Sequence, residues 1–221
     1  MNNARLAVIG ATAALSLALS GCAAGEEAAD PAATAPSDTT TAPTTSAEAG
    51  AGGVTEIADI YGPACAQVPT EGEGSAQGMI DDPVGTAASN NPLLSTLTQA
   101  VQAAGLVDTL NDPEAAYTVF APANSAFEAL PAGTLDELLA DPQGRLTEIL
   151  TYHVMPERYD AEGLAEAGTV TTVQGDELVI TGEPTELVID EQQQASVLCG
   201  NIPTANATVF VIDDVLMPET A

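Results

Sequence analysis

The spacing of hydrophobic residues divides the patterned part of the chain into two halves. From about Met79 to Leu150, apolar residues recur every three or four positions, which is typical of amphipathic helices. Three helix starts accompany this spacing, each an Asp or Asn followed by Pro, at residues 82–83, 91–92 and 141–142. The clearest stripe predicts a helix that Gly105 ends, and it consists of Leu93, Leu94, Leu97, Val101 and Ala104.

Other patterns in this half predict one strand and two more helices. The run YTVFA at residues 117–121 is β-branched and aromatic, and it predicts an early buried strand. After the strand, Asn124 is a candidate N-cap for a short helix that carries Phe127 and Leu130. The run TLDE at residues 134–137 has the form of a capping box and predicts the next helix start.

The second half of the patterned region predicts strands. Short β-branched runs, separated by Gly and Pro, lie at residues 169–173, 177–181, 186–189, 196–202 and 207–218. Helices followed by a meander of strands, with one strand placed early, indicate an α+β fold. We therefore expect N-terminal helices packed on a mostly antiparallel wedge of short strands.

Residues 1–21 have the form of a secretory signal peptide. A single basic residue, Arg5, precedes an apolar run from Leu6 to Leu19 that is too short to span a membrane. The run ends in Leu-Ser-Gly-Cys, which resembles the lipobox of bacterial lipoproteins. The resemblance implies that Cys22 carries diacylglycerol and acyl chains, which anchor the exported protein to the outer face of the cytoplasmic membrane, at the cell surface. Partial release of the protein from the membrane is an alternative.

Residues 22–58 are rich in Ala, Thr, Pro and Glu and show no apolar periodicity. Such a segment buries too little apolar surface to offset the entropy of ordering, so we expect a flexible tether. Its Thr/Pro-rich part resembles the O-glycosylated stalks of exported actinobacterial proteins, and a plain spacer is an equal alternative. The globular domain then comprises residues 59–221.

The charge of the chain limits its partners. There are 32 acidic residues against three Lys and Arg, which gives a net charge of -29. A surface of this sign repels phosphate backbones, so we expect no nucleic-acid partner. We expect a monomeric domain that meets the membrane through its lipid anchor.

Two cysteines remain once Cys22 is assigned to the lipid, namely Cys65 and Cys199. In an exported protein, two such thiols most often form a disulfide. A metal site would need further ligands at closer spacing, and the sequence has no C-x-x-C. We therefore predict a Cys65–Cys199 disulfide, no metal, and no cofactor other than the acyl chains.

The run LTYHVM at residues 150–155 holds the only histidine of the chain. A catalytic histidine needs partners, and the sequence has no G-x-S-x-G, H-E-x-x-H, P-loop or G-x-G-x-x-G motif. We predict no catalytic residue and no enzyme. Where the helix passes into a strand, a neutral His153 can bridge buried backbone groups. The alternative is that Tyr152 and His153 mark a partner-binding surface.

Three segments together resemble the fasciclin domain: TVFAPANSAF at 118–127, the Tyr152-His153 pair, and TVFVIDDVLMP at 208–218. The resemblance covers about residues 79–218, with Ala123 where the family commonly has Thr. The flanking segments resemble the secreted and lipid-anchored fasciclin antigens of mycobacteria and related actinobacteria. That resemblance implies that an N-terminal cysteine pairs with one just before the last strands, in agreement with Cys65–Cys199.

The resemblance implies a role in adhesion or cell-surface interaction, with no established catalytic activity or cofactor. The function that the resemblance implies is therefore that of a non-enzymatic surface lipoprotein that binds an extracellular protein or matrix component. The alternative is a carrier that holds a small apolar or lipid ligand in a cleft between helices and sheet. A third hypothesis is an envelope scaffold without a specific partner.

Overall fold

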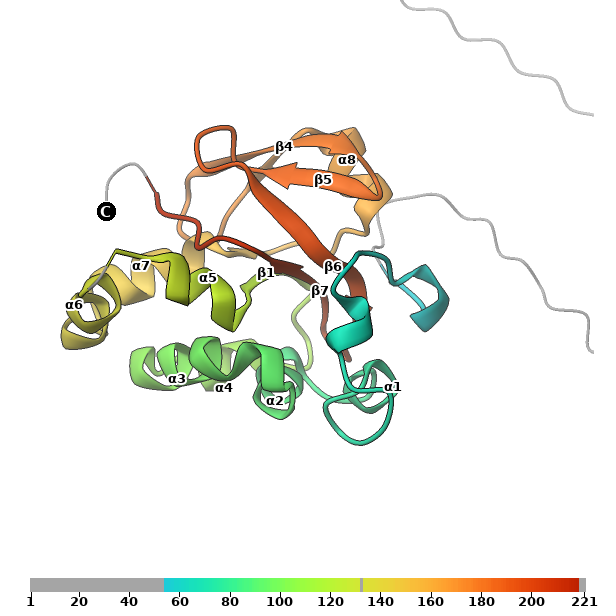
Figure 1. Ribbon diagram of the computed structural model, residues 1–221, viewed down its shortest axis with the longest axis horizontal. Coiled ribbons are helices and arrows are strands. Elements are labelled where there is room, and N and C mark those ends of the chain that lie inside the picture. Colours follow the sequence, from blue (N-terminus) through green and yellow to red (C-terminus); the bar gives the residue numbers. More distant parts are fainter. Residues whose placement is uncertain (1–53, 132, 219–221) are drawn as a thin grey trace, which may run out of the picture. The chain divides into compact units, whose positions relative to one another are not determined.

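The computed structural model describes residues 54–131 and 133–218 (Figure 1). The helical elements are η1 (Ile57–Asp59), η2 (Cys65–Gln67), α1 (Ala76–Met79), α2 (Val84–Asn90), η3 (Pro92–Leu94), α3 (Ser95–Ala104), α4 (Val107–Leu110), α5 (Asn124–Ala129), α6 (Thr134–Ala140), α7 (Arg145–Tyr152) and α8 (Ala161–Ala167). The strands are β1 (Tyr117–Pro122), β2 (Val154–Met155), β3 (Thr169–Thr171), β4 (Glu177–Glu183), β5 (Glu186–Ile189), β6 (Ala195–Pro203) and β7 (Ala207–Ile212). The predicted signal peptide, Cys22 and most of the predicted tether lie outside the described residues.

The strands of the described region form one sheet in the order β2-β1-β7-β6-β5-β4-β3. The early strand β1 runs parallel to the last strand β7, with Thr118 opposite Thr208 and Phe120 opposite Phe210. The other neighbouring strands are antiparallel. The predicted α+β fold with a mostly antiparallel sheet is confirmed, and two of the three sequence motifs supply its parallel pair.

Side chains of β1 and β7 alternate between two hydrophobic clusters, because successive residues of a strand point to opposite faces. Val119 and Val209 belong to the first cluster, together with residues of the helices α2, α3 and α7. Phe120 and Phe210 belong to the second cluster, with their ring centroids 5.8 Å apart. Figure 1 shows α2, α3 and α4 on one side of β1 and β7, with β4, β5 and α8 on the other.

The strands wrap around the second cluster. The backbone N–H of Val173, just after β3, donates to the carbonyl of Val154 in β2 at 2.7 Å, and Gln174 N–H donates to the carbonyl of Thr151 at 3.3 Å. The first and last strands of the sheet order therefore meet. They enclose the second cluster together with α8, whose Leu164 is fully buried.

Two of the predicted helix caps are wrong. The helix α5 begins at Asn124 itself, and the preceding residue, Ala123, makes no side-chain cap. The helix α6 begins at Thr134 after Gly133, which has a φ of 96°, so the expected capping box does not form. In contrast, Asn91 caps η3 as expected, because its side chain accepts from the N–H of Leu93 at 3.0 Å.

The two Asp-Pro pairs lie outside the helices that we expected them to open. The helix α2 begins at Val84, and its cap position is Pro83, which provides no capping side chain. The helix α7 begins later, at Arg145, after a turn in which Asp141 Oδ1 accepts from the N–H of Gly144 at 3.1 Å. Each Asp-Pro pair therefore precedes a helix, as predicted, but does not supply the first residue of that helix.

The side chain of Asn124 instead links α5 to both α3 and η3. Its Oδ1 accepts from the N–H of Thr96 at 3.0 Å, and its Nδ2 donates to the carbonyl of Pro92 at 2.9 Å. These bonds connect the start of α5 to the start of α3 and to η3. The asparagine of the TVFAPANSAF segment thus contributes to the packing of the helical layer.

We expect Asn124→Ala to lower the free energy of unfolding by about 1–2 kcal/mol, because two backbone groups lose their partner in a partly exposed setting. Asn124→Asp retains the acceptor for Thr96 and loses the donor for Pro92, so it should cost less. Urea denaturation of the three proteins at neutral pH gives the comparison. A loss below about 0.5 kcal/mol in the alanine variant would show that these two bonds do not stabilise the fold.

Candidate functional site

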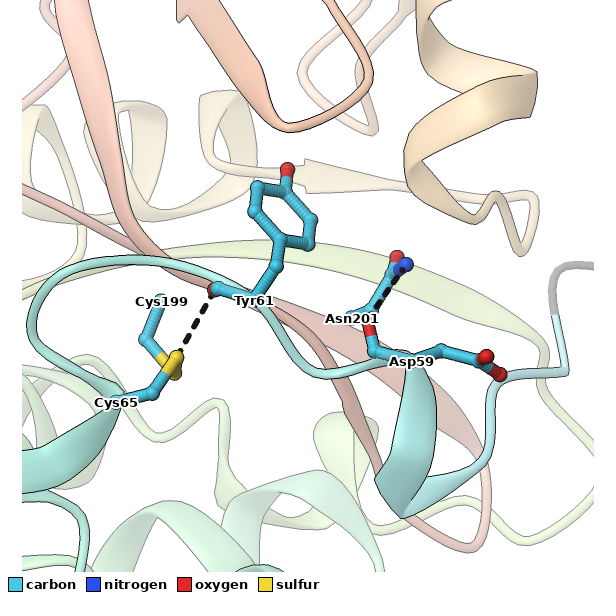
Figure 2. The surroundings of a disulfide bond; sticks show 5 residues. All are labelled: Asp59, Tyr61, Cys65, Cys199 and Asn201. Atoms are coloured by element: carbon cyan, nitrogen blue, oxygen red, sulfur yellow. Dashed lines mark hydrogen bonds between the residues drawn. A yellow bond between two sulfur atoms is a disulfide. The ribbon is translucent and has the colours of Figure 1, made fainter.

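A segment of residues 57–67, which we call the strap, lies along β6 and is joined to it by a disulfide (Figure 2). Cys65 and Cys199 form this disulfide with their Cα atoms 5.0 Å apart, which confirms the predicted pair. Gly200 N–H donates to the carbonyl of Tyr61 at 2.8 Å, and Tyr61 N–H donates to the carbonyl of Gly200 at 3.3 Å. Cys65 Sγ also lies 2.9 Å from the Tyr61 carbonyl oxygen, as a close contact only, because a disulfide sulfur carries no hydrogen.

The close approach of the strap requires glycine on both sides. A Cβ on Gly200 would lie 2.7 Å from the ring of Tyr61. Gly62 has a φ of +123°, and a Cβ there would lie 2.3 Å from the carbonyl oxygen of Leu198. Both positions therefore exclude larger residues.

Asn201, the next residue of β6, links the strap to α8. Its Nδ2 donates to the carbonyl of Asp59 at 3.3 Å, and its Oδ1 accepts from the N–H of Ala161 at 2.9 Å. Sequence analysis identified the cysteine of this region and missed the strap contacts around it. The available signal was the run Cys-Gly-Asn at 199–201, in which a glycine directly follows the bridged cysteine.

His153 lies at the C-terminal end of α7 and bridges two buried backbone groups, as expected from the sequence. Its Nδ1 lies 2.8 Å from the carbonyl oxygen of Ile149, and its Nε2 lies 3.0 Å from the backbone nitrogen of Leu216. Because a carbonyl only accepts and an N–H only donates, the ring carries its proton on Nδ1. Both ring nitrogens are therefore occupied by structural hydrogen bonds.

Burial lowers the pKa of His153 to about 4, and the hydrogen bond to the Ile149 carbonyl offsets part of that effect. The imidazole is therefore neutral at physiological pH. A proton added at Nε2 would also face the N–H of Leu216, which already donates to that nitrogen. This environment holds the ring as a fixed connector between α7 and the segment after β7.

The alternative, a partner-binding surface at Tyr152 and His153, is not compatible with their burial. Tyr152 is 6% exposed and lies in the second hydrophobic cluster, and His153 is 2% exposed. The helix α7 ends at Tyr152 with this side chain directed into the core. The motif therefore acts in the interior of the domain.

An apolar cavity of about 80 Å³ lies between the helices and the sheet. The helices α2, α3 and α4 form one wall, and β1 and β7 form the opposite wall. Residues of the segment 150–154, including His153, contribute a further wall.

The remaining predicted site residue, Cys22, lies outside the described residues. Within residues 54–131 and 133–218, no group of three or more His, Cys, Asp and Glu side chains is placed to hold a metal ion. No helix in the same ranges is long and apolar enough to cross a membrane. The region that the structure describes is thus an α+β module with a disulfide-fixed strap, a histidine that serves the fold, and one apolar cavity as its candidate binding site.

Known proteins identify the family of this module. Residues 92–218 match the fasciclin domain. The chain is 42% identical to the cell surface glycolipoprotein MPT83 of Mycobacterium tuberculosis over 97% of this chain and 96% of the relative, and equally so to MPB83 of Mycobacterium bovis. It is 47% identical to the immunogenic protein MPB70 of Mycobacterium bovis over 72% of this chain and 83% of the relative. The chain therefore belongs to the fasciclin-domain family.

The fold agrees with this assignment. A solved structure of a FAS1 domain pair from the insect cell adhesion molecule Fasciclin I matches with a TM-score of 0.57 at 19% identity, over 65% of this chain and about half of that chain (53%). Fasciclin-domain antigens of this kind are not known as enzymes. The names of the relatives, cell surface glycolipoproteins and immunogenic proteins, indicate an exported or cell-surface location.

Proposed function

We propose that the protein is a lipid-anchored fasciclin domain that is displayed outside the cell and mediates adhesion to an extracellular protein or matrix component. One observation carries the proposal: the likeness to cell surface glycolipoproteins extends over 97% of the chain, so it includes the N-terminal segment with its Leu-Ser-Gly-Cys run. The acyl chains on Cys22, at about 0.8 kcal/mol per buried CH₂, hold the protein at the membrane surface. The segment before the strap then serves as the tether.

We expect Cys22→Ser to abolish the lipid-modified form and to leave an uncleaved precursor that keeps residues 1–21, because serine offers no thiol for diacylglycerol. Cell fractionation and intact-mass measurement give the result. Ala24→Ser, the introduction of serine two positions further on, is the control: it should keep its location and its lipid modification, with a mass raised only by the one oxygen atom that serine adds. Membrane retention of Cys22→Ser with wild-type mass would contradict the anchor.

The charge of the surface defines the chemistry of the partner. Of the two arginines in the described region, Arg158 directs its guanidinium inward: Nε donates to Thr208 Oγ1 at 3.1 Å and Nη2 donates to the carbonyl of Thr204 at 3.0 Å. Arg145 is exposed in a chain with 32 acidic residues. Electrostatic complementarity therefore favours a partner with a basic surface.

Cross-linking on intact cells tests the adhesive role. The full-length protein, displayed on its own cells, should capture a discrete extracellular partner, and capture should weaken as NaCl rises from about 50 mM to about 500 mM, because salt screens exposed charges. Capture of no discrete partner would favour the scaffold hypothesis. Capture that does not depend on salt would contradict the basic partner.

A further inference from the structure

We propose that the cavity between the helical layer and the sheet is a binding site for an uncharged hydrocarbon group, such as the last carbons of a lipid chain. This inference is independent of the adhesive role proposed above. The cavity lies within the first hydrophobic cluster, where α2 and α3 face β1 and β7. Its volume of about 80 Å³ is well above the roughly 10–15 Å³ that one water-sized group needs.

The buried polar side chains of the cavity wall already make hydrogen bonds within the fold. Thr98 Oγ1 donates to the carbonyl of Leu94 at 3.0 Å, and Thr204 Oγ1 donates to the carbonyl of Ala207 at 2.9 Å. Asn91 Oδ1 accepts from Leu93 N–H, and both ring nitrogens of His153 are bonded. A water molecule inside would find few hydrogen-bond partners, and dry apolar cavities of this kind take up apolar guests.

The cavity is partly open to solvent, so a guest can reach it. Val173 belongs to its wall and is nevertheless 45% exposed, which places an apolar side chain at the rim. The backbone N–H of Val173 is fixed to the Val154 carbonyl at 2.7 Å, so this position of the rim is structurally defined. An exposed apolar side chain at the opening of an apolar cavity is suited to the entry of a hydrocarbon chain.

Charge selects against an ionised guest. Among the described residues that form the wall, none is Asp, Glu, Lys or Arg. A carboxylate inside would lose its hydration without gaining a partner, and outside it would meet the field of a chain with net charge -29. The guest is therefore a neutral hydrocarbon group and not a fatty-acid anion.

Methyl NMR of the full-length protein tests the site with three probes of equal chain length: n-hexane, sodium hexanoate, and monomeric dihexanoylphosphatidylcholine. We expect n-hexane to shift the methyl signals of the wall residues Val84, Leu97 and Val209, while Leu187 and Ile189 of the second cluster stay unshifted. Hexanoate should have no effect at the same concentration. Shifts with the phosphatidylcholine would identify a chain attached to a lipid as the guest, and shifts with hexane alone would identify a free hydrocarbon.

Filling the cavity should abolish the shifts. Ala87, on α2, is buried and lines the cavity, so Ala87→Leu places three carbons in it, and Val101→Ile is a smaller second filling. Ala103→Leu makes the same change on the exposed side of α3 and should leave the shifts intact. The proposal is overturned if hexane leaves the wall methyls unshifted, if hexanoate shifts them as strongly, or if the folded Val101→Ile and Ala87→Leu proteins respond like the wild type.

Discussion

The double variant Cys65→Ala/Cys199→Ala is expected to lose about 4–5 kcal/mol of free energy of unfolding. The disulfide joins residues 134 positions apart, and the chain-entropy treatment gives about 5 kcal/mol for a loop of that length as an upper value. Alanine is the better replacement, because Cys199 is fully buried and a serine hydroxyl there would need a new partner. Chemical denaturation of the oxidised wild type, the reduced wild type and the variant measures the loss.

The reduced wild type is the matched control, since it lacks the bond and keeps both side chains. It should lose nearly as much stability as the double variant. Hydrogen exchange locates the effect: the amides of Tyr61 and Gly200, which bond the strap to β6, should exchange faster in the variant, while those of β1 and β7 stay protected. Unchanged exchange at Tyr61 and Gly200 would show that backbone hydrogen bonds hold the strap without the disulfide.

The elements that were predictable from sequence are those whose residues carry a strong local pattern. The run at 186–189 forms β5 with the predicted bounds, and YTVFA at 117–121 forms β1 with one further residue, Pro122. The strand β2 was expected only as a strand after His153, without bounds, and the four-residue helices α1 and α4 were not predicted, because elements this short persist through tertiary contacts. The helix α8 has a capping Asp160 and a terminating Gly168, but few apolar residues between them to mark it in the sequence.

The features of the candidate site likewise differ in how far the sequence alone predicts them. The disulfide followed from counting cysteines and the role of His153 from the need to pair buried polar atoms, so neither required the three-dimensional arrangement. The strap depends on the fit of Tyr61 over Gly200, which involves residues more than a hundred positions apart. The cavity depends on what the side chains of several helices and strands leave unfilled. A sequence gives the volume of each side chain but not the space between them, so only a general cleft was foreseeable.

Acidic pH should lower the free energy of unfolding through the titration of His153. Its pKa is about 4 in the folded protein and about 6.5 in the unfolded chain, so the unfolded state binds more protons between those values. The stabilisation from the neutral ring is thus fully present above about pH 6.5 and is lost as the pH falls toward 4. The linkage relation gives a loss of about 2 kcal/mol between about pH 7 and pH 5.

Two variants separate the titration of the ring from its hydrogen bonds. His153→Ala is expected to cost about 3–5 kcal/mol at pH 7, because the Ile149 carbonyl and the Leu216 N–H are left unpaired in the core and a cavity opens. His153→Gln keeps a donor and an acceptor without a titrating group, so it should cost less at pH 7 and remove most of the stability change between pH 7 and pH 5. Since the chain has no other histidine, this difference belongs to one side chain. An equal pH dependence in wild type and His153→Gln, followed by urea denaturation, would contradict the buried neutral ring.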